Sequence, residues 1–311
     1  DRADMVYLLG EALFRQSRYE DSIQTWQEGI ELYQQQGDHP GMARLFARSA
    51  RAAWYYGDHP EGLSLSKAGW DAVKDMPENA SKAMLAHELG RAYHFNGYPE
   101  AAEPLCRQAL EMSERVGAVD IQADALTTLG VLPNVSRDES LASLEKAVEL
   151  AESNGLMEIA TRANHNLGVM TAEQLGDQKT AREHYLRAAE LAKQRGAAQE
   201  ELFSLVQAAG VSMAMGELKT AEELVARIKR IRSTLTDPSQ AHFEYAGIEF
   251  GLYFLNGEFE DALEILRRVR VEAREKGDLQ MLHNYCTNQA DVFLVLDSIE
   301  GIEDWSEAEQ A

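Results

Sequence analysis

Residues 88–110 read ELGRAYHFNGYPEAAEPLCRQAL, and the spacing of small and aromatic residues in this stretch recurs along the chain. A small residue aligned with Ala102 returns every 38 to 41 residues, and a turn-forming residue follows each copy at a similar spacing. The two columns are Ser22, Gly62, Ala102, Ser140, Ala181, Ala221, Ala262 and Gly37, Pro77, Gly117, Gly155, Gly196, Asp237, Gly277. Because both columns have one period and share the short fourth copy, the chain is predicted to consist of internal repeats.

Within a repeat, the apolar residues follow helical spacing. The stretch 19–33 shows this with residues three and four apart, which share one helix face: Tyr19, Ile23, Trp26, Ile30 and Tyr33. Pro60 and Pro99 fall where a first helical turn is expected. Each repeat is therefore predicted to be two helices joined by a short turn, in an all-α chain.

The small residues indicate where the two helices of a hairpin meet. In the quoted stretch, Gly90 of the first helix and Ala102 of the second are expected at a close backbone crossing. Tyr93, Tyr98 and Leu105 would fill the space around it. One hairpin cannot bury its own apolar faces, so neighbouring hairpins are expected to stack.

This pattern resembles the tetratricopeptide (TPR) repeat. The resemblance is carried in the third copy by Leu89-Gly90, Tyr93, Gly97-Tyr98, Ala102 and Ala109-Leu110. Units near 40 residues, longer than the usual 34, are similar to those of the maltose-activator regulators, kinesin light chains, spindle-orientation adaptors and Bacillus Rap proteins. The resemblance implies a right-handed superhelical α-solenoid of about seven TPR helix hairpins plus a C-terminal capping helix.

We expect a single array over residues 1–297, followed by an acidic tail or linker over 298–311. The hairpins are expected at about 3–37, 41–76, 78–117, 118–155, 156–196, 198–236 and 238–277, with the cap helix at 278–297. The fourth hairpin is shortened at its internal turn, around Leu132-Pro133-Asn134, so its stacking is expected to depart from the regular pattern.

Composition excludes several functions. The chain carries 52 acidic and 30 basic residues, a net charge of −22, which disfavours nucleic acid and anionic membranes as partners. Two cysteines do not make a disulfide framework, so a cytoplasmic location is expected. His87-Glu88 lacks the second histidine of a zinc motif, since position 91 is Arg91. We therefore expect no enzyme activity, no cofactor and no metal.

TPR geometry places the first helix of each hairpin on the concave face of the array. The residues assigned to this groove are Arg51, Trp54, Tyr55, His87, Arg91, His94, Phe95, Arg162 and His165. Such a lining would suit an acidic peptide with an apolar anchor, since guanidinium groups bind carboxylates and aromatic rings supply interface energy. The competing interpretation is structural: the rings pack between hairpins, and the arginines form salt bridges along a helix.

The function expected from these features is a protein- or peptide-binding scaffold, the sensor or adaptor module of a larger cytosolic regulatory protein. Its partner would be another protein or another domain of the same polypeptide. One alternative is a structural or oligomerisation spacer that acts through convex faces or ends, as in a homo-oligomer. Another is a small-molecule effector-binding module of a bacterial transcription regulator.

Overall fold

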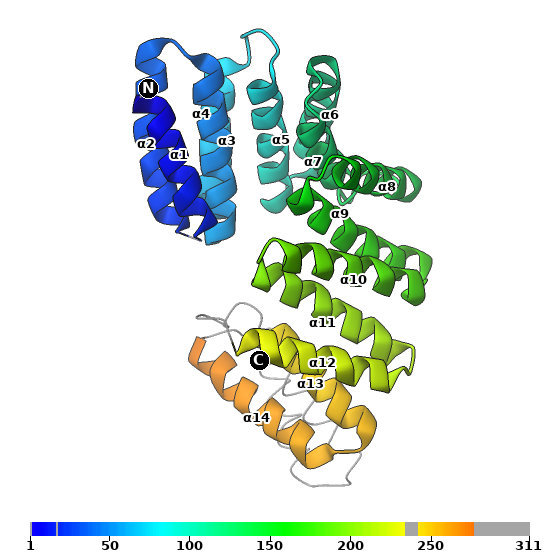
Figure 1. Cartoon of the computed structure of the whole chain (residues 1–311). Helices are drawn as coiled ribbons and strands as arrows, with labels where there is room; N and C mark the ends of the chain where they lie inside the picture. Colours follow the sequence, from blue (N-terminus) through cyan, green and yellow to red (C-terminus); the bar gives the residue numbers. More distant parts are fainter. Residues whose placement is uncertain (1, 17, 234–241, 277–311) are drawn as a thin grey trace. The chain divides into compact units, whose positions relative to one another are not determined.

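A computed structural model describes residues 2–16, 18–233 and 242–276, which form fourteen α-helices and no β-strand (Figure 1). The all-α, helical-repeat prediction is confirmed. The expected cap helix 278–297 and tail 298–311 lie outside the described residues, as do 234–241 at the junction of the last two expected hairpins.

The helices follow one another in seven pairs. They are α1 (Arg2–Arg15) and α2 (Tyr19–Gln36), α3 (His39–Tyr56) and α4 (His59–Val73), α5 (Ala80–Phe95) and α6 (Pro99–Val116), α7 (Val119–Leu129) and α8 (Arg137–Ser153), α9 (Met157–Met170) and α10 (Gln178–Gln194), α11 (Ala198–Ala214) and α12 (Leu218–Arg232), and α13 (His242–Asn256) and α14 (Phe259–Lys276). A π-helical turn, η1 (Thr171–Leu175), continues α9.

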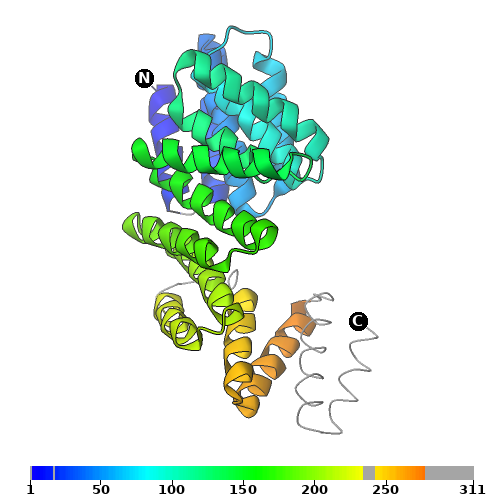
Figure 2. The same cartoon turned by 90° about the vertical axis from the view of Figure 1, so that its right-hand side faces the viewer.

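The chain packs as two compact units, Asp1–Leu167 and Gly168–Ala311. In the first unit, α3 packs against α2, α4 and α5, and α5 packs in turn against α4, α6 and α7. In the second unit, α11 packs against α10, α12 and α13, and α14 pairs with α13 (yellow and orange in Figure 2). The single array over 1–297 stays a prediction.

Local sequence signals set the helix ends. The carboxylates of Asp38 and Asp58 accept hydrogen bonds from backbone N–H groups in the first turns of α3 and α4. Pro60 and Pro99 lie in the first turns of α4 and α6, as predicted. Gly37 ends α2 with φ of 69°, a left-handed conformation that glycine adopts without strain.

The predicted close crossing in the third hairpin is confirmed. A Cβ atom on Gly90 would lie 2.7 Å from Sγ of Cys106 and 3.1 Å from the carbonyl oxygen of Ala102. Both distances are too short for a side chain at position 90. Glycine is therefore required there for α5 and α6 to approach each other.

Each unit has its own apolar core. In the first unit, Trp26, Tyr33, Leu45 and Leu85 are buried where the first three hairpins stack. In the second unit, the buried core is built around Leu202, Leu205 and Ile228.

The short fourth hairpin keeps its packing by an irregular route. Helix α7 ends at Leu129, and α8 begins only at Arg137. Between them Leu132 and Val135 are buried against Ala102 and Cys106 of the preceding hairpin. The connection between α7 and α8 thus supplies apolar contacts that a longer first helix would otherwise make.

Across the described residues, no helix combines the length and the apolar character that crossing a bilayer requires.

Candidate functional site

The predicted groove residues lie on the first helices of three hairpins, all within the first unit. Helix α3 carries Arg51, Trp54 and Tyr55, and α5 carries His87, Arg91, His94 and Phe95. Arg162 and His165 lie on α9. Residues from α7 complete the arrangement.

Arg51 is the centre of a buried ion-pair network. Its exposed fraction is 5%. Its Nε donates to Oε1 of Glu88 at 2.9 Å, and its Nη2 donates to the same carboxylate and, at 2.8 Å, to Oδ2 of Asp124. One guanidinium therefore ties α3 to both α5 and α7.

Two further arginines complete the pairing of these carboxylates. Arg162 donates through Nη2 to Oδ1 of Asp124, and its Nη1 lies 4.0 Å from Oε1 of Glu158. Nη1 of Arg91 lies 3.5 Å from Oε2 of Glu88. The three guanidinium groups thus face three carboxylates, with formal charges that cancel.

Burial and neighbouring charges shift the pKa values of this network in opposite directions. Burial raises the pKa of the Glu88 carboxyl, but the charges of Arg51 and Arg91 lower it more, so it lies well below its ordinary value. Burial, together with repulsion from Arg51, lowers the pKa of Arg91 to about 10 and that of Arg162 to about 9. All three groups remain charged at neutral pH.

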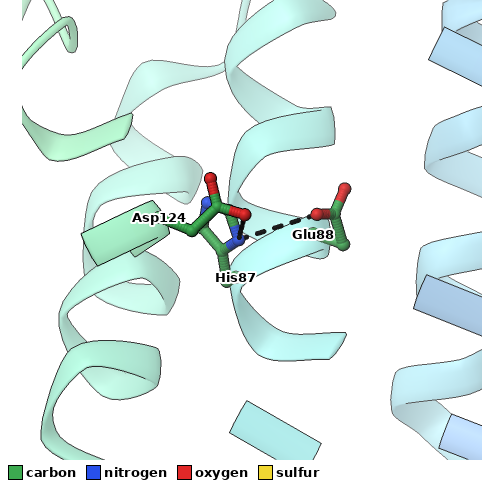
Figure 3. Close-up of side chains that lie close together, drawn as sticks. All are labelled: His87, Glu88 and Asp124. Carbon is green, nitrogen blue, oxygen red and sulfur yellow. Dashed lines mark ion pairs between the residues drawn. The ribbon is translucent and has the colours of Figure 1, made fainter. Parts of the chain in front are cut away.

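His87 lies beside the two carboxylates, as Figure 3 shows. Its Nδ1 is 3.6 Å from Oε1 of Glu88 and 3.7 Å from Oδ2 of Asp124, and its Nε2 is 2.8 Å from Oγ1 of Thr128. Burial, reinforced by the nearby positive charge of Arg51, lowers the pKa of His87 to about 3. The ring is therefore neutral at pH 7 and contributes a hydrogen bond rather than a charge.

Among the described residues, His87, Glu88 and Asp124 form a group with the composition of a metal site. The carboxylate oxygens nearest His87, however, are the two to which Nη2 of Arg51 already donates. A metal ion between them would meet the buried guanidinium at close range and repel it. The donor set therefore fits the arginine and does not fit a metal.

An aromatic group borders the network. The guanidinium carbon of Arg91 lies 4.1 Å from the ring centroid of Trp54 and 5.1 Å from that of Phe95, in cation–π geometry. The two rings are 5.1 Å apart, and Phe95 is 40% exposed. This group presents an apolar surface with a buried positive charge beneath it.

The other predicted groove residues have more local surroundings. Tyr55 stacks on Tyr19 of the first hairpin, with ring centroids 5.4 Å apart. The ring of His94 lies 5.0 Å from that of Phe95. Burial lowers the pKa of His94 and lowers that of His165 to about 4, so both rings are neutral at pH 7.

A pocket of about 310 Å³ opens beside the network. It is lined by Ala47, Arg48, Arg51, Met84, His87, Glu88, Asp120, Ile121, Asp124, Leu156, Met157, Glu158 and Ile159. Both basic groups in this lining are already paired, since Arg48 binds Glu11 through two hydrogen bonds. Asp120 makes no side-chain hydrogen bond or ion pair with the residues that the structure describes. The pocket therefore offers an apolar wall and an excess of negative charge.

Sequence reasoning placed Arg51, His87, Arg91 and Arg162 on one lining, and the structure joins them in one network. It missed Glu88 and Asp124, which were assigned to solvated helix faces or given no role. The signal that could have found Glu88 is positional. Glu88 is one repeat of 40 residues after Arg48, on the helix face that meets the preceding hairpin.

Comparison with known proteins supports the fold. A family model of soluble NSF attachment proteins (SNAP) matches residues 90–239, just under half of the chain. A search of curated proteins finds no match by sequence.

Several solved structures have the same architecture. The quorum sensor NprR from B. thuringiensis, in its apo form, matches 100% of this chain and 88% of its own, with a TM-score of 0.73 and 14% identity. A STAND signal transduction ATPase with a tetratricopeptide repeat sensor, from Pyrococcus horikoshii, matches 99% of this chain and 46% of its own, with a TM-score of 0.73 and 16% identity. A Rap protein complexed with competence and sporulation factor matches 99% and 97%, with a TM-score of 0.61 and 12% identity. The chain thus has the fold of TPR-type helical repeat proteins, as the resemblance in the sequence predicts.

Proposed function

We propose that the pocket between α3, α5, α7 and α9 binds a segment of another protein. The segment would place an aliphatic side chain against the apolar wall and a cationic group near the carboxylates. The observation that carries this proposal is the coexistence, in one 310 Å³ pocket, of apolar residues with the acidic side chains of Asp120 and Glu158.

The charge of the ligand follows from how the arginines are used. The sequence favoured an acidic peptide because Arg51 and Arg91 were counted as open binding groups. Both are buried and face Glu88, so an incoming carboxylate would have to displace a carboxylate already in place. Asp120 and Glu158 lie in the first turns of α7 and α9 and line the pocket. A lysine, an arginine or an N-terminal ammonium group is therefore the ligand group that the pocket favours.

The aromatic group extends the proposed binding surface. Trp54, Arg91 and Phe95 line a second, smaller pocket together with Asn96. Asn96 is anchored by hydrogen bonds from its Nδ2 to the carbonyl oxygens of His59 and Ala92. Rigid aromatic groups of this kind provide binding energy at low entropic cost, so Phe95 is the favoured contact for a second apolar side chain of the ligand.

We further propose that the chain is a sensor or adaptor module of a cytosolic regulatory protein. This step is supported by the kind of proteins that share its fold, which include a quorum sensor, a repeat sensor of a signal transduction ATPase and a Rap protein in complex with a factor. At 12 to 16% identity, these proteins support the class of function and leave the ligand to be argued from the pocket.

A selection from a random peptide library on the full chain tests the proposal. Peptides retained by the wild type should be enriched in lysine or arginine next to an aliphatic residue. They should not be retained by Met157→Trp, which narrows the pocket from a position that is already 41% exposed. Enrichment of acidic peptides, or equal retention by Met157→Trp, would refute the proposed site.

A small cationic effector is the second candidate ligand. A volume of about 310 Å³ lies at the lower end of the range for small-molecule sites. A thermal shift with amines and amino acids, lost in Met157→Trp, would favour it over a protein segment.

A further inference from the structure

The first helix of the chain presents an apolar stripe to the outside. Met5, Leu8 and Leu9 are 64%, 62% and 55% exposed, and Ala12 is also exposed. These residues are spaced three and four apart and therefore form one continuous face of α1. The opposite face, which includes Val6 and Leu13, is buried.

The repeat shows what this face does elsewhere in the first unit. The positions 40 and 80 residues after Met5 are Leu45 and Leu85, and both are 0% exposed. Leu45 fits against the preceding hairpin, where a Cβ on Gly29 of α2 would lie 2.5 Å from its Cδ1. The stripe on α1 is thus the surface by which each hairpin packs on the one before it.

Local charge makes this face suited to a second copy of the chain. The whole chain carries −22, which opposes self-association over most of its surface. Helix α1 carries only Arg2, Asp4, Glu11 and Arg15, so its own charges sum to zero. Two copies can therefore meet at α1 without the repulsion that would arise elsewhere.

The arrangement of charges also fits a two-fold contact. Asp4 and Arg15 are eleven residues apart, close to three helical turns, and therefore lie along the same edge of the stripe. When two α1 helices pack antiparallel, that edge of one copy faces the same edge of the other with the ends exchanged. Asp4 of each copy then lies opposite Arg15 of its partner, and two equivalent ion pairs flank the buried leucines.

We infer that the chain forms a homodimer in which the Met5, Leu8, Leu9 and Ala12 faces of two α1 helices pack antiparallel. This contact continues, across a two-fold axis, the interface by which hairpins stack within the chain. It lies on different helices from the proposed ligand pocket, so either proposal can fail without the other.

Light scattering coupled to gel filtration tests the dimer on the full chain. The wild type should approach twice its mass of 34.7 kDa as its concentration rises through the micromolar range. Leu8→Glu should remain a monomer at a concentration at least tenfold higher, because it puts a charge in the centre of the contact. Val116→Glu, at an exposed apolar position on α6, is the matched control and should dimerise as the wild type does.

A charge exchange tests the orientation. Arg15→Asp alone and Asp4→Arg alone should each weaken the dimer, since each places like charges opposite each other at both ends. A mixture of the two variants should restore it, because the mixed dimer has both ion pairs with their signs exchanged. A wild type that stays monomeric, a dimer that survives Leu8→Glu, or a mixture no stronger than its components would overturn the inference.

Discussion

Arg51 of α3 and Glu88 of α5 form a buried ion pair across two hairpins and are 37 residues apart in the sequence. Glu11 and Arg48 have the same separation and join α1 to α3 in the same way, with the charges in the opposite order. A separation of 37 is one repeat less one helical turn, so these pairs connect equivalent points on successive first helices. The stacking of the first unit therefore depends on specific charges as well as on apolar contacts.

Removing one partner of the buried pair should strongly destabilise the chain. Arg51→Met leaves Glu88 with only the more distant Arg91, at a loss of about 3–5 kcal/mol in the free energy of unfolding. Urea denaturation followed by circular dichroism measures the loss. Arg115→Met, which breaks the exposed pair with Glu78, is the control and should change stability far less.

The double variant separates pairing from packing. Arg51→Met combined with Glu88→Met should be more stable than Arg51→Met alone, because no unpaired carboxylate is left at position 88. Equal or greater loss in the double variant would contradict the role given to the ion pair. The first result also means that charge reversal at Arg51 cannot serve as a clean test of ligand binding.

Stability should fall as pH decreases from about 6.5 toward 4. The pKa of His87 is lowered from 6.5 to about 3, so in this range the unfolded chain binds a proton that the folded chain does not. His165, with a pKa lowered to about 4, acts in the same direction. Each group can contribute up to about 1.4 kcal/mol per pH unit. Below about pH 4.5, Glu88 adds a further loss, because its pKa is lowered in the folded state.

The test is the urea midpoint measured between pH 7 and pH 4. His87→Gln retains a side chain that can hydrogen-bond to Thr128 and should show a shallower decline than the wild type. A decline with an unchanged slope in His87→Gln would show that its buried, neutral ring is not a source of the acid sensitivity.

Two glycines on helices should respond to alanine in opposite ways. Gly90→Ala places a Cβ 2.7 Å from Sγ of Cys106 and should destabilise the chain by about 1–3 kcal/mol. Gly247 of α13 has no atom within 4 Å of the place that a Cβ would occupy, and alanine there should stabilise the helix by about 0.5–1 kcal/mol. Thermal denaturation of both variants checks the pair, and a similar change in both would contradict the close crossing at Gly90.

The repeat period and the helix ends were predictable because each depends on short-range chemistry. Gly90 and Ala102 are recognisable as a crossing since only small residues fit there, and Asp38 and Asp58 mark helix starts through their caps. The early end of α7 was not predictable in detail. It depends on whether Leu132 can be buried by the preceding hairpin, which is a tertiary contact.

The candidate site was only half predictable. The sequence identifies Arg51 and Arg91 as lining residues, but it does not show what neutralises them. An acidic residue on an amphipathic helix is usually solvated, so Glu88 and Asp124 were not expected to be partners. Their role depends on the stagger of α3, α5 and α7, which sequence periodicity constrains to within about one turn and no better.

The most direct test of the account is the affinity of a selected cationic, aliphatic peptide for the full chain, measured by fluorescence anisotropy. Asp120→Asn combined with Glu158→Gln removes the pocket's unbalanced negative charge and should weaken binding by about tenfold, or 1.4 kcal/mol. Glu145→Gln, on the exposed side of α8, should bind as the wild type does. Equal affinity for the wild type and the doubly substituted pocket would contradict the proposal that this pocket recognises a positively charged segment.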